Sequence, residues 1–199
     1  MDLSEADLSQ WDAWSPDELA RRLDGVEATW YVIAGWALDL FVGHQTREHA
    51  DLEIGVRADE FAAVQDAFRD FDLVVVGDGR IWPLNDATLA AHRQTWVGDR
   101  ETEAWRVDVF RERWDGDEWV LDRDPRIRIP TARLVARSSS GMPYMSPEVV
   151  LLLKAKNPRP KDELDFAAVH HRLTARQRAW LEDALALVHP GHHWLDELR

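Results

Sequence analysis

Cysteine is absent from this sequence of 199 residues. Its absence excludes disulfide bonds, thiolate nucleophiles and cysteine-based metal sites. No apolar run is long enough to span a membrane, and the first residues, Met1-Asp2-Leu3-Ser4-Glu5, lack the basic stretch of a signal peptide. The sequence therefore predicts a protein without membrane association that resides in the cytoplasm.

Cations are scarce as well, because 24 lysine and arginine residues stand against 37 aspartate and glutamate residues, for a formal net charge of −13. Bulk binding to nucleic-acid backbones needs a basic surface and is not expected. A small cationic acceptor, by contrast, would be attracted by acidic walls. The sequence also lacks a Gly-x-x-x-x-Gly-Lys loop and a Gly-x-Ser-x-Gly elbow, which disfavours P-loop NTPase and α/β-hydrolase chemistry.

The stretch Asp-Leu-Glu-Ile-Gly-Val at residues 51–56 alternates strictly, as a strand with one buried face does. Asp51 and Glu53 then share one face of the strand. Two neighbouring carboxylates repel each other and are costly to bury unless a cation lies between them. Mg2+ suits this role, since it takes oxygen ligands and retains open positions for substrate phosphates. The alternative is an edge strand with a solvated acidic face.

The preceding residues predict a strand at 30–33, a turn at Gly35, a short helix that Gly43 closes, and a loop. Gly35 lets the backbone approach a ligand closely, and the start of the helix offers unpaired N–H groups to an anion. Thr46 and Arg47 add a hydroxyl group and a forked cation, both suited to phosphate oxygens. The sequence thus predicts a phosphate-binding loop beside a divalent-metal pair.

This segment resembles the nucleotidyltransferase superfamily of the polymerase-beta type and, more narrowly, its aminoglycoside and lincosamide nucleotidyltransferase-like group. The pattern of that group is Gly-Gly-Trp-Ala…Asp…Gly…Thr-Arg…His…Asp-Leu-Asp. The matching residues are Gly35, Trp36, Ala37, Asp39, Gly43, Thr46, Arg47, His49, Asp51, Leu52 and Glu53. Two positions depart from the pattern, because Ala34 stands at the first glycine and Glu53 at the second aspartate. The resemblance extends from about residue 30 to residue 194.

The resemblance implies a third carboxylate on a later strand, for which Asp108 in the alternating run 105–110 is the candidate. Asp108 would complete the metal site or act as general base on the acceptor hydroxyl. The alternative is that Asp108 pairs with Arg106 or with a neighbouring strand.

A later Lys…Lys-Asp…Asp-Phe stretch of the group is matched at Lys154 and Lys161, followed by Asp162, Asp165 and Phe166. The resemblance implies that one of the two lysines binds the nucleotide or its leaving pyrophosphate. The structural alternative is that these lysines pair with the acidic residues Asp162, Glu163 or Asp165.

The order of predicted elements indicates an α/β (α+β) fold, a nucleotidyltransferase-like mixed sheet with helices packed on it. After the serine-rich stretch 138–141 the pattern becomes helical, with helices expected at 146–156, 161–172 and 174–189. We therefore expect a nucleotidyltransferase-like domain at 1–140 and a C-terminal helical subdomain at 141–199.

The resemblance implies a Mg2+-dependent enzyme that moves a nucleoside monophosphate, AMP from ATP, to a hydroxyl of an aminoglycoside-like small molecule. Asp51, Glu53 and Asp108 would hold the metal and perform catalysis. The nucleotide would be bound by Gly35, Trp36, Thr46, Arg47, Lys154 and Lys161. Two alternatives stay open, a tRNA-modifying nucleotidyltransferase toxin and a catalytically silent nucleotide-binding module that has lost its chemistry at Ala34 and Glu53.

Overall fold

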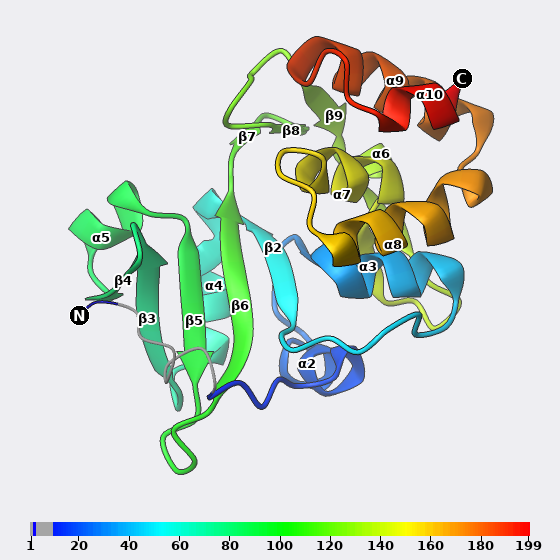
Figure 1. The fold of residues 1–199 in the computed structure, drawn as a ribbon. Coiled ribbons are helices and arrows are strands. Elements are labelled where there is room, and N and C mark those ends of the chain that lie inside the picture. The colour runs from blue at the N-terminus through cyan, green and yellow to red at the C-terminus, as the bar shows by residue number, and fades with distance from the viewer. Residues whose placement is uncertain (1, 3–9) are drawn as a thin grey trace. The chain divides into compact units, whose positions relative to one another are not determined.

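The computed structural model describes residues 2 and 10–199. It forms two compact units, the first from Met1–Val32 and His49–Trp114 and the second from Ile33–Glu48 and Asp115–Arg199. Figure 1 shows the helices and strands of both units. The predicted domains 1–140 and 141–199 have other boundaries and stay a prediction. Met1 and residues 3–9, on which the argument against a signal peptide rests in part, lie outside the described residues.

The first unit is built on a mixed sheet. In spatial order, six of its strands are β1 (Trp30–Val32), β2 (Glu53–Arg57), β6 (Trp105–Glu112), β5 (Gln94–Gly98), β3 (Asp72–Gly77) and β4 (Arg80–Pro83). Strands β2 and β6 are parallel, whereas the other neighbours in this order pair antiparallel. The predicted alternation is confirmed, because Leu52, Ile54 and Val56 are fully buried while Asp51 and Glu53 are partly exposed.

Helix α4 covers one face of this sheet (Figure 1). The helices of the unit are α2 (Pro16–Arg22), α4 (Phe61–Ala67), which follows the 3-10 turn η1 (Ala58–Glu60), and α5 (Asp86–Ala91). On β6, Val107 and Val109 are fully buried and share their face with Arg111, whose guanidinium lies over the Phe61 ring of α4. Asp108 therefore points to the opposite face of the sheet from Arg111.

The second unit is mostly helical. Its helices are α3 (Ala34–Val42), α6 (Thr131–Leu134), α7 (Pro147–Lys154), α8 (Pro160–Val169) with the 3-10 turn η2 (His170–Arg172), α9 (Ala175–Val188) and α10 (Trp194–Leu198). Two antiparallel strand pairs accompany them, β8 (Glu118–Val120) with β9 (Arg128–Pro130) and β10 (Val135–Arg137) with β11 (Pro143–Met145). The short β7 (Trp114–Asp115) lies where the chain passes between the units. The predicted helical character of the C-terminal part is confirmed.

Helix α3 forms the centre of the second unit, since it packs against both α7 and α8. Gly43 closes it in the left-handed region at φ 90°, as predicted. At its start, Ala34 also has a left-handed φ of 54°, a conformation that costs an L-residue with a Cβ about 1 kcal/mol. The alanine at the first glycine position of the group's pattern is therefore held in the conformation that glycine adopts without strain.

No helix in the described part of the chain is both long and apolar enough to cross a membrane.

Candidate active site

The predicted carboxylates lie on two paired strands of the first unit. Glu53 begins β2 and is directly opposite Asp108 in the parallel register with β6. The backbone N–H of Asp108 donates to the carbonyl of Leu52 at 2.9 Å, which fixes the two strands at this point. Asp108 is only 3% exposed, whereas Asp51 and Glu53 are partly exposed. The parallel pairing thus brings residues more than 50 positions apart in sequence to one place.

The surroundings of Asp108 disfavour its charged form. Burial raises its pKa well above the ordinary value, the neighbouring charge of Glu53 adds to this, and Asp51 contributes less. The side-chain amide of Gln94 donates to Oδ2 and opposes the shift. The neighbouring indole of Trp96 also opposes the shift, although its N–H and the buried oxygen Oδ1 of Asp108 each lack a hydrogen bond of standard geometry.

This donor set fits a divalent cation. A buried carboxylate oxygen without a donor, beside two further carboxylates, is costly in the absence of positive charge. Across residues 2 and 10–199, no three acidic or histidine side chains are already close enough to hold a metal. The partly exposed side chains of Asp51 and Glu53 would therefore have to turn toward an ion as it binds.

Of the two alternative partners for Asp108, Arg106 is wrong, whereas a partner on a neighbouring strand is present in Gln94 of β5. Arg106 shares a face of β6 with Asp108, but its guanidinium binds Asp12 and, at 3.1 Å, Asp99. Gln94, which does bind Asp108, was not predicted from the sequence. Its position on β5, whose neighbouring residues pair with β6, is the signal that could have found it.

The predicted phosphate-binding residues before Asp51 lie in the second unit. Gly35 is buried in the first turn of α3 and Trp36 is partly buried beside it. Thr46 uses its backbone N–H and its hydroxyl to bind Oδ1 of Asp39, at 3.0 and 2.5 Å. Asp39 is 4% exposed and thereby fixes the loop that follows α3. Trp36 and Asp39 also line a cavity of about 190 Å3 together with the serine stretch 138–140.

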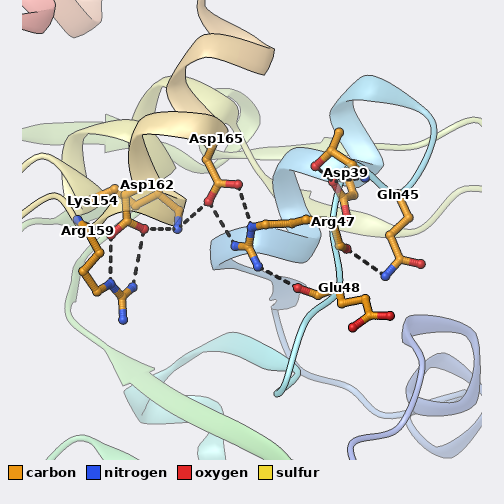
Figure 2. A network of polar contacts seen from close by, with 9 residues as sticks. Asp39, Gln45, Arg47, Glu48, Lys154, Arg159, Asp162 and Asp165 are labelled. Carbon is orange, nitrogen blue, oxygen red and sulfur yellow. Dashed lines mark hydrogen bonds and ion pairs between the residues drawn. The ribbon is translucent and has the colours of Figure 1, made fainter.

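Arg47 belongs to a chain of alternating charges (Figure 2). Its Nε and Nη2 donate to the two carboxylate oxygens of Asp165, at 2.9 and 3.0 Å. The ammonium group of Lys154 contacts Asp165 at 2.9 Å and Asp162 at 2.7 Å. Arg159 binds Asp162 through Nε at 2.9 Å. We call these five residues the charge chain.

The two carboxylates of the charge chain are buried, yet their pKa values are lowered. Burial alone would raise the pKa of Asp165, but hydrogen bonds from Arg47 and the charge of Lys154 outweigh it and lower the pKa. For Asp162, hydrogen bonds from Arg159 and Lys154 likewise overcome burial and lower the pKa. The bond to Asp165 raises the pKa of Arg47. Of the two interpretations of Lys154, the ion pair with acidic neighbours is therefore present, while Lys161 is exposed at the start of α8.

Three solved structures show that the chain has the nucleotidyltransferase fold. Lincosamide antibiotic adenylyltransferase LnuA with bound lincomycin is 16% identical, with a TM-score of 0.55 over 84% of this chain and 97% of that chain. ANT(2")-Ia in complex with adenylyl-2"-tobramycin is 11% identical, with a TM-score of 0.57 over 86% and 95%. An antigenic nucleotidyltransferase-like protein from Paracoccidioides brasiliensis is 16% identical, with a TM-score of 0.52 over 100% and 94%.

In sequence, residues 17–88 match the family described as aminoglycoside-2''-adenylyltransferase. This segment includes the whole motif from Gly35 to Glu53, although not Asp108 or the charge chain beyond Arg47. The predicted resemblance to the aminoglycoside and lincosamide nucleotidyltransferase-like group and the predicted fold class are confirmed. No curated protein matches the chain in sequence.

Proposed function

We propose that this protein is a Mg2+-dependent nucleotidyltransferase that moves AMP from ATP to a hydroxyl of a small, cationic acceptor. The observation that carries the proposal is the buried, incompletely satisfied Asp108 opposite Glu53 on parallel strands of a nucleotidyltransferase fold. The formal net charge of −13 favours a cationic acceptor. An aminoglycoside-like molecule has this character, and ANT(2")-Ia is a structural neighbour in complex with an adenylylated aminoglycoside.

In the proposed reaction an acceptor hydroxyl oxygen forms a bond to the α-phosphorus, the bond to the β-phosphate oxygen breaks, and pyrophosphate leaves. Mg2+ held by Asp51, Glu53 and Asp108 would neutralise the charge on the phosphates. Asp108 either serves as a ligand or takes the hydroxyl proton, and its raised pKa makes it a stronger base than an ordinary carboxylate.

Gly35, Trp36, Thr46, Arg47, Lys154 and Lys161 are proposed to bind the nucleotide. Gly35 and Trp36 lie in the first turn of α3, and the loop bearing Thr46 and Arg47 is fixed at Asp39 and Asp165. Arg47 and Lys154 already have carboxylate partners. They would therefore bind a phosphate while they keep those ion pairs. Exposed Lys161 is open to a more mobile group such as the leaving pyrophosphate.

The proposal is tested by calorimetric titration of a non-hydrolysable ATP analogue, with and without Mg2+, into wild type and Asp51→Asn. We expect Mg2+-dependent binding in wild type that Asp51→Asn loses while its fold, checked by circular dichroism, stays intact. The matched control is Asp66→Asn, an exposed aspartate of the same unit, which should bind as wild type does.

Pyrophosphate release with a panel of aminoglycoside and lincosamide acceptors then measures transfer. Asp51→Asn should lower the rate by at least about 1,000-fold, since loss of charge stabilisation at the reacting phosphate commonly costs that much. Normal transfer by Asp51→Asn would show that the site is assigned wrongly.

A second candidate function is a catalytically silent nucleotide-binding module. It is favoured by the strained Ala34 and by Glu53, the two departures from the group's pattern. Such a module would bind the ATP analogue with Mg2+ but release no pyrophosphate with any acceptor, and Glu53→Asp combined with Ala34→Gly would restore none.

A further inference from the structure

A cavity of about 510 Å3 lies in the first unit, apart from the carboxylates. It opens near the end of β6, on the face of the sheet that α4 covers, whereas Asp108 points to the other face. Phe61, Leu89 and Trp114 give it apolar walls. Its volume is within the range of sites for small organic molecules. The proposed nucleotidyl transfer makes no use of it.

Three arginines, Arg93, Arg111 and Arg113, line this cavity in a protein of strongly negative charge. Arg111 is 5% exposed, which is unusual for an arginine without a carboxylate partner. Its Nη2 donates to the carbonyl of His92, while Nε and Nη1 are buried and meet no acceptor in the described chain. A buried cation left in this state is costly, and an anionic ligand would relieve the cost.

The acidic residues on the cavity wall do not supply that anion. Asp59 is bound by the guanidinium of Arg57 at 2.9 and 3.1 Å. Glu112 accepts a hydrogen bond of 2.7 Å from the buried hydroxyl of Tyr31. Burial lowers the pKa of Arg111 to about 10, and the neighbouring Arg93 adds to the shift, so Arg111 is affected more by a like charge than by an opposite one.

We infer that this cavity binds a small organic phosphate, with its phosphate group at Arg111 and its organic part against Phe61, Leu89 and Trp114. The two buried N–H groups of Arg111 that meet no acceptor, together with the neighbouring like charge of Arg93, favour a dianion over a monoanion such as a carboxylate. The apolar walls favour an organic ester over inorganic phosphate.

Thermal unfolding at fixed ionic strength tests the inference, with inorganic phosphate, phenyl phosphate and benzoate as probes and sodium chloride as the reference. Phenyl phosphate at about 100-fold excess over its Kd should raise the Tm of wild type by roughly 5–10 °C. At equal concentration inorganic phosphate should raise it less, and benzoate least. A shift with benzoate alone, or equal shifts with all salts, overturns the inference.

Arg111→Met should abolish the response to phenyl phosphate without lowering the Tm of the ligand-free protein. Arg69→Met, a control at an exposed arginine of the same unit outside the cavity, should keep the response. Leu89→Trp, which fills the cavity and leaves Arg111 in place, should also abolish it. A full response in Arg111→Met or in Leu89→Trp overturns the inference. Asp51→Asn should respond as wild type does, so this result is independent of the proposed transfer.

Discussion

Asp108 in the first unit and Asp165 in the second are each 3% exposed, yet their pKa values are shifted in opposite directions. The charged neighbours of Asp108 are carboxylates, and the side chains of Gln94 and Trp96 only partly offset their effect on its pKa. Asp165 lies between Arg47 and Lys154. Burial penalises the charged form of both side chains, so the charge of their neighbours decides whether the pKa is raised or lowered.

The two groups therefore serve different purposes. Each carboxylate of the charge chain has two cationic partners. These ion pairs connect α8, the end of α7 and the loop after α3. Asp108 of β6 has a buried oxygen without a hydrogen bond in the described protein and lies opposite Glu53 of β2, so this pair of carboxylates is suited to an added cation. A buried charge without a partner of opposite charge indicates a functional site, whereas a buried charge with such partners indicates a structural ion pair.

The largest stability change is expected from removing the central cation of the charge chain. Lys154→Met leaves two buried aspartates that have each lost one partner and should lower the free energy of unfolding by about 3 kcal/mol. Urea denaturation measures it. The control is Lys156→Met, at an exposed lysine two residues further on, which should change the value by less than about 0.5 kcal/mol. Equal effects of the two variants would show that the ion pairs of Lys154 do not stabilise the fold.

The opposite sign is expected at Asp108. Asp108→Asn removes a carboxylate that is penalised by burial and by Glu53, so it should raise the free energy of unfolding at pH 8, without metal, by about 1–2 kcal/mol. Adding Mg2+ should stabilise wild type and leave the variant unchanged. Asp99→Asn is the matched control, since hydrogen bonds lower the pKa of Asp99, and this variant should lose stability instead. Destabilisation by Asp108→Asn would show that its charge is compensated.

The pH dependence of stability separates the two groups further. Asp162 and Asp165 have lowered pKa values in the folded protein. Their contribution to stability is therefore complete above the pKa of 3.8 in the unfolded chain and is lost as the pH falls through their pKa values in the folded protein. Asp108 has a raised pKa, so stability declines as the pH rises from 3.8 through its folded value.

Urea denaturation at several pH values from 3 to 8 measures both the loss of stability at low pH and the decline at higher pH. Lys154→Met should reduce the loss at low pH, and Asp108→Asn should remove the decline at higher pH. Each change in the free energy of unfolding should be about 1 kcal/mol or more. If one variant altered the stability at low pH and at higher pH equally, the two groups of carboxylates would not be independent.

The smallest effect is expected at Ala34, where the cost is steric rather than electrostatic. Ala34→Gly relieves a left-handed φ of 54° and should raise the free energy of unfolding by about 0.5–1 kcal/mol, after the higher entropy of glycine in the unfolded chain is subtracted. Ala37→Gly, in the same helix but with a buried methyl group, should lower it by about 1 kcal/mol. Thermal unfolding of both variants checks the signs, and a loss of stability in Ala34→Gly contradicts the strain.

The sequence by itself determined the features that depend on local pattern. The alternation from Asp51 to Val56 predicted which side chains are buried, Gly43 predicted the end of α3, and the motif from Gly35 to Glu53 predicted the fold. These features follow from the period of the strand and from the backbone freedom of glycine, which adjacent residues encode.

Only the tertiary structure decided which partner each charged side chain has. Arg47 binds Asp165, 118 positions away, and Asp108 binds Gln94 rather than Arg106 on its own strand. The guanidinium of Arg111, with two buried N–H groups that meet no acceptor, takes its place only once α4 and β6 are packed together. Such partnerships depend on burial and on strand register, which distant residues set jointly, so the sequence supplies the charges while the fold determines which of them are compensated.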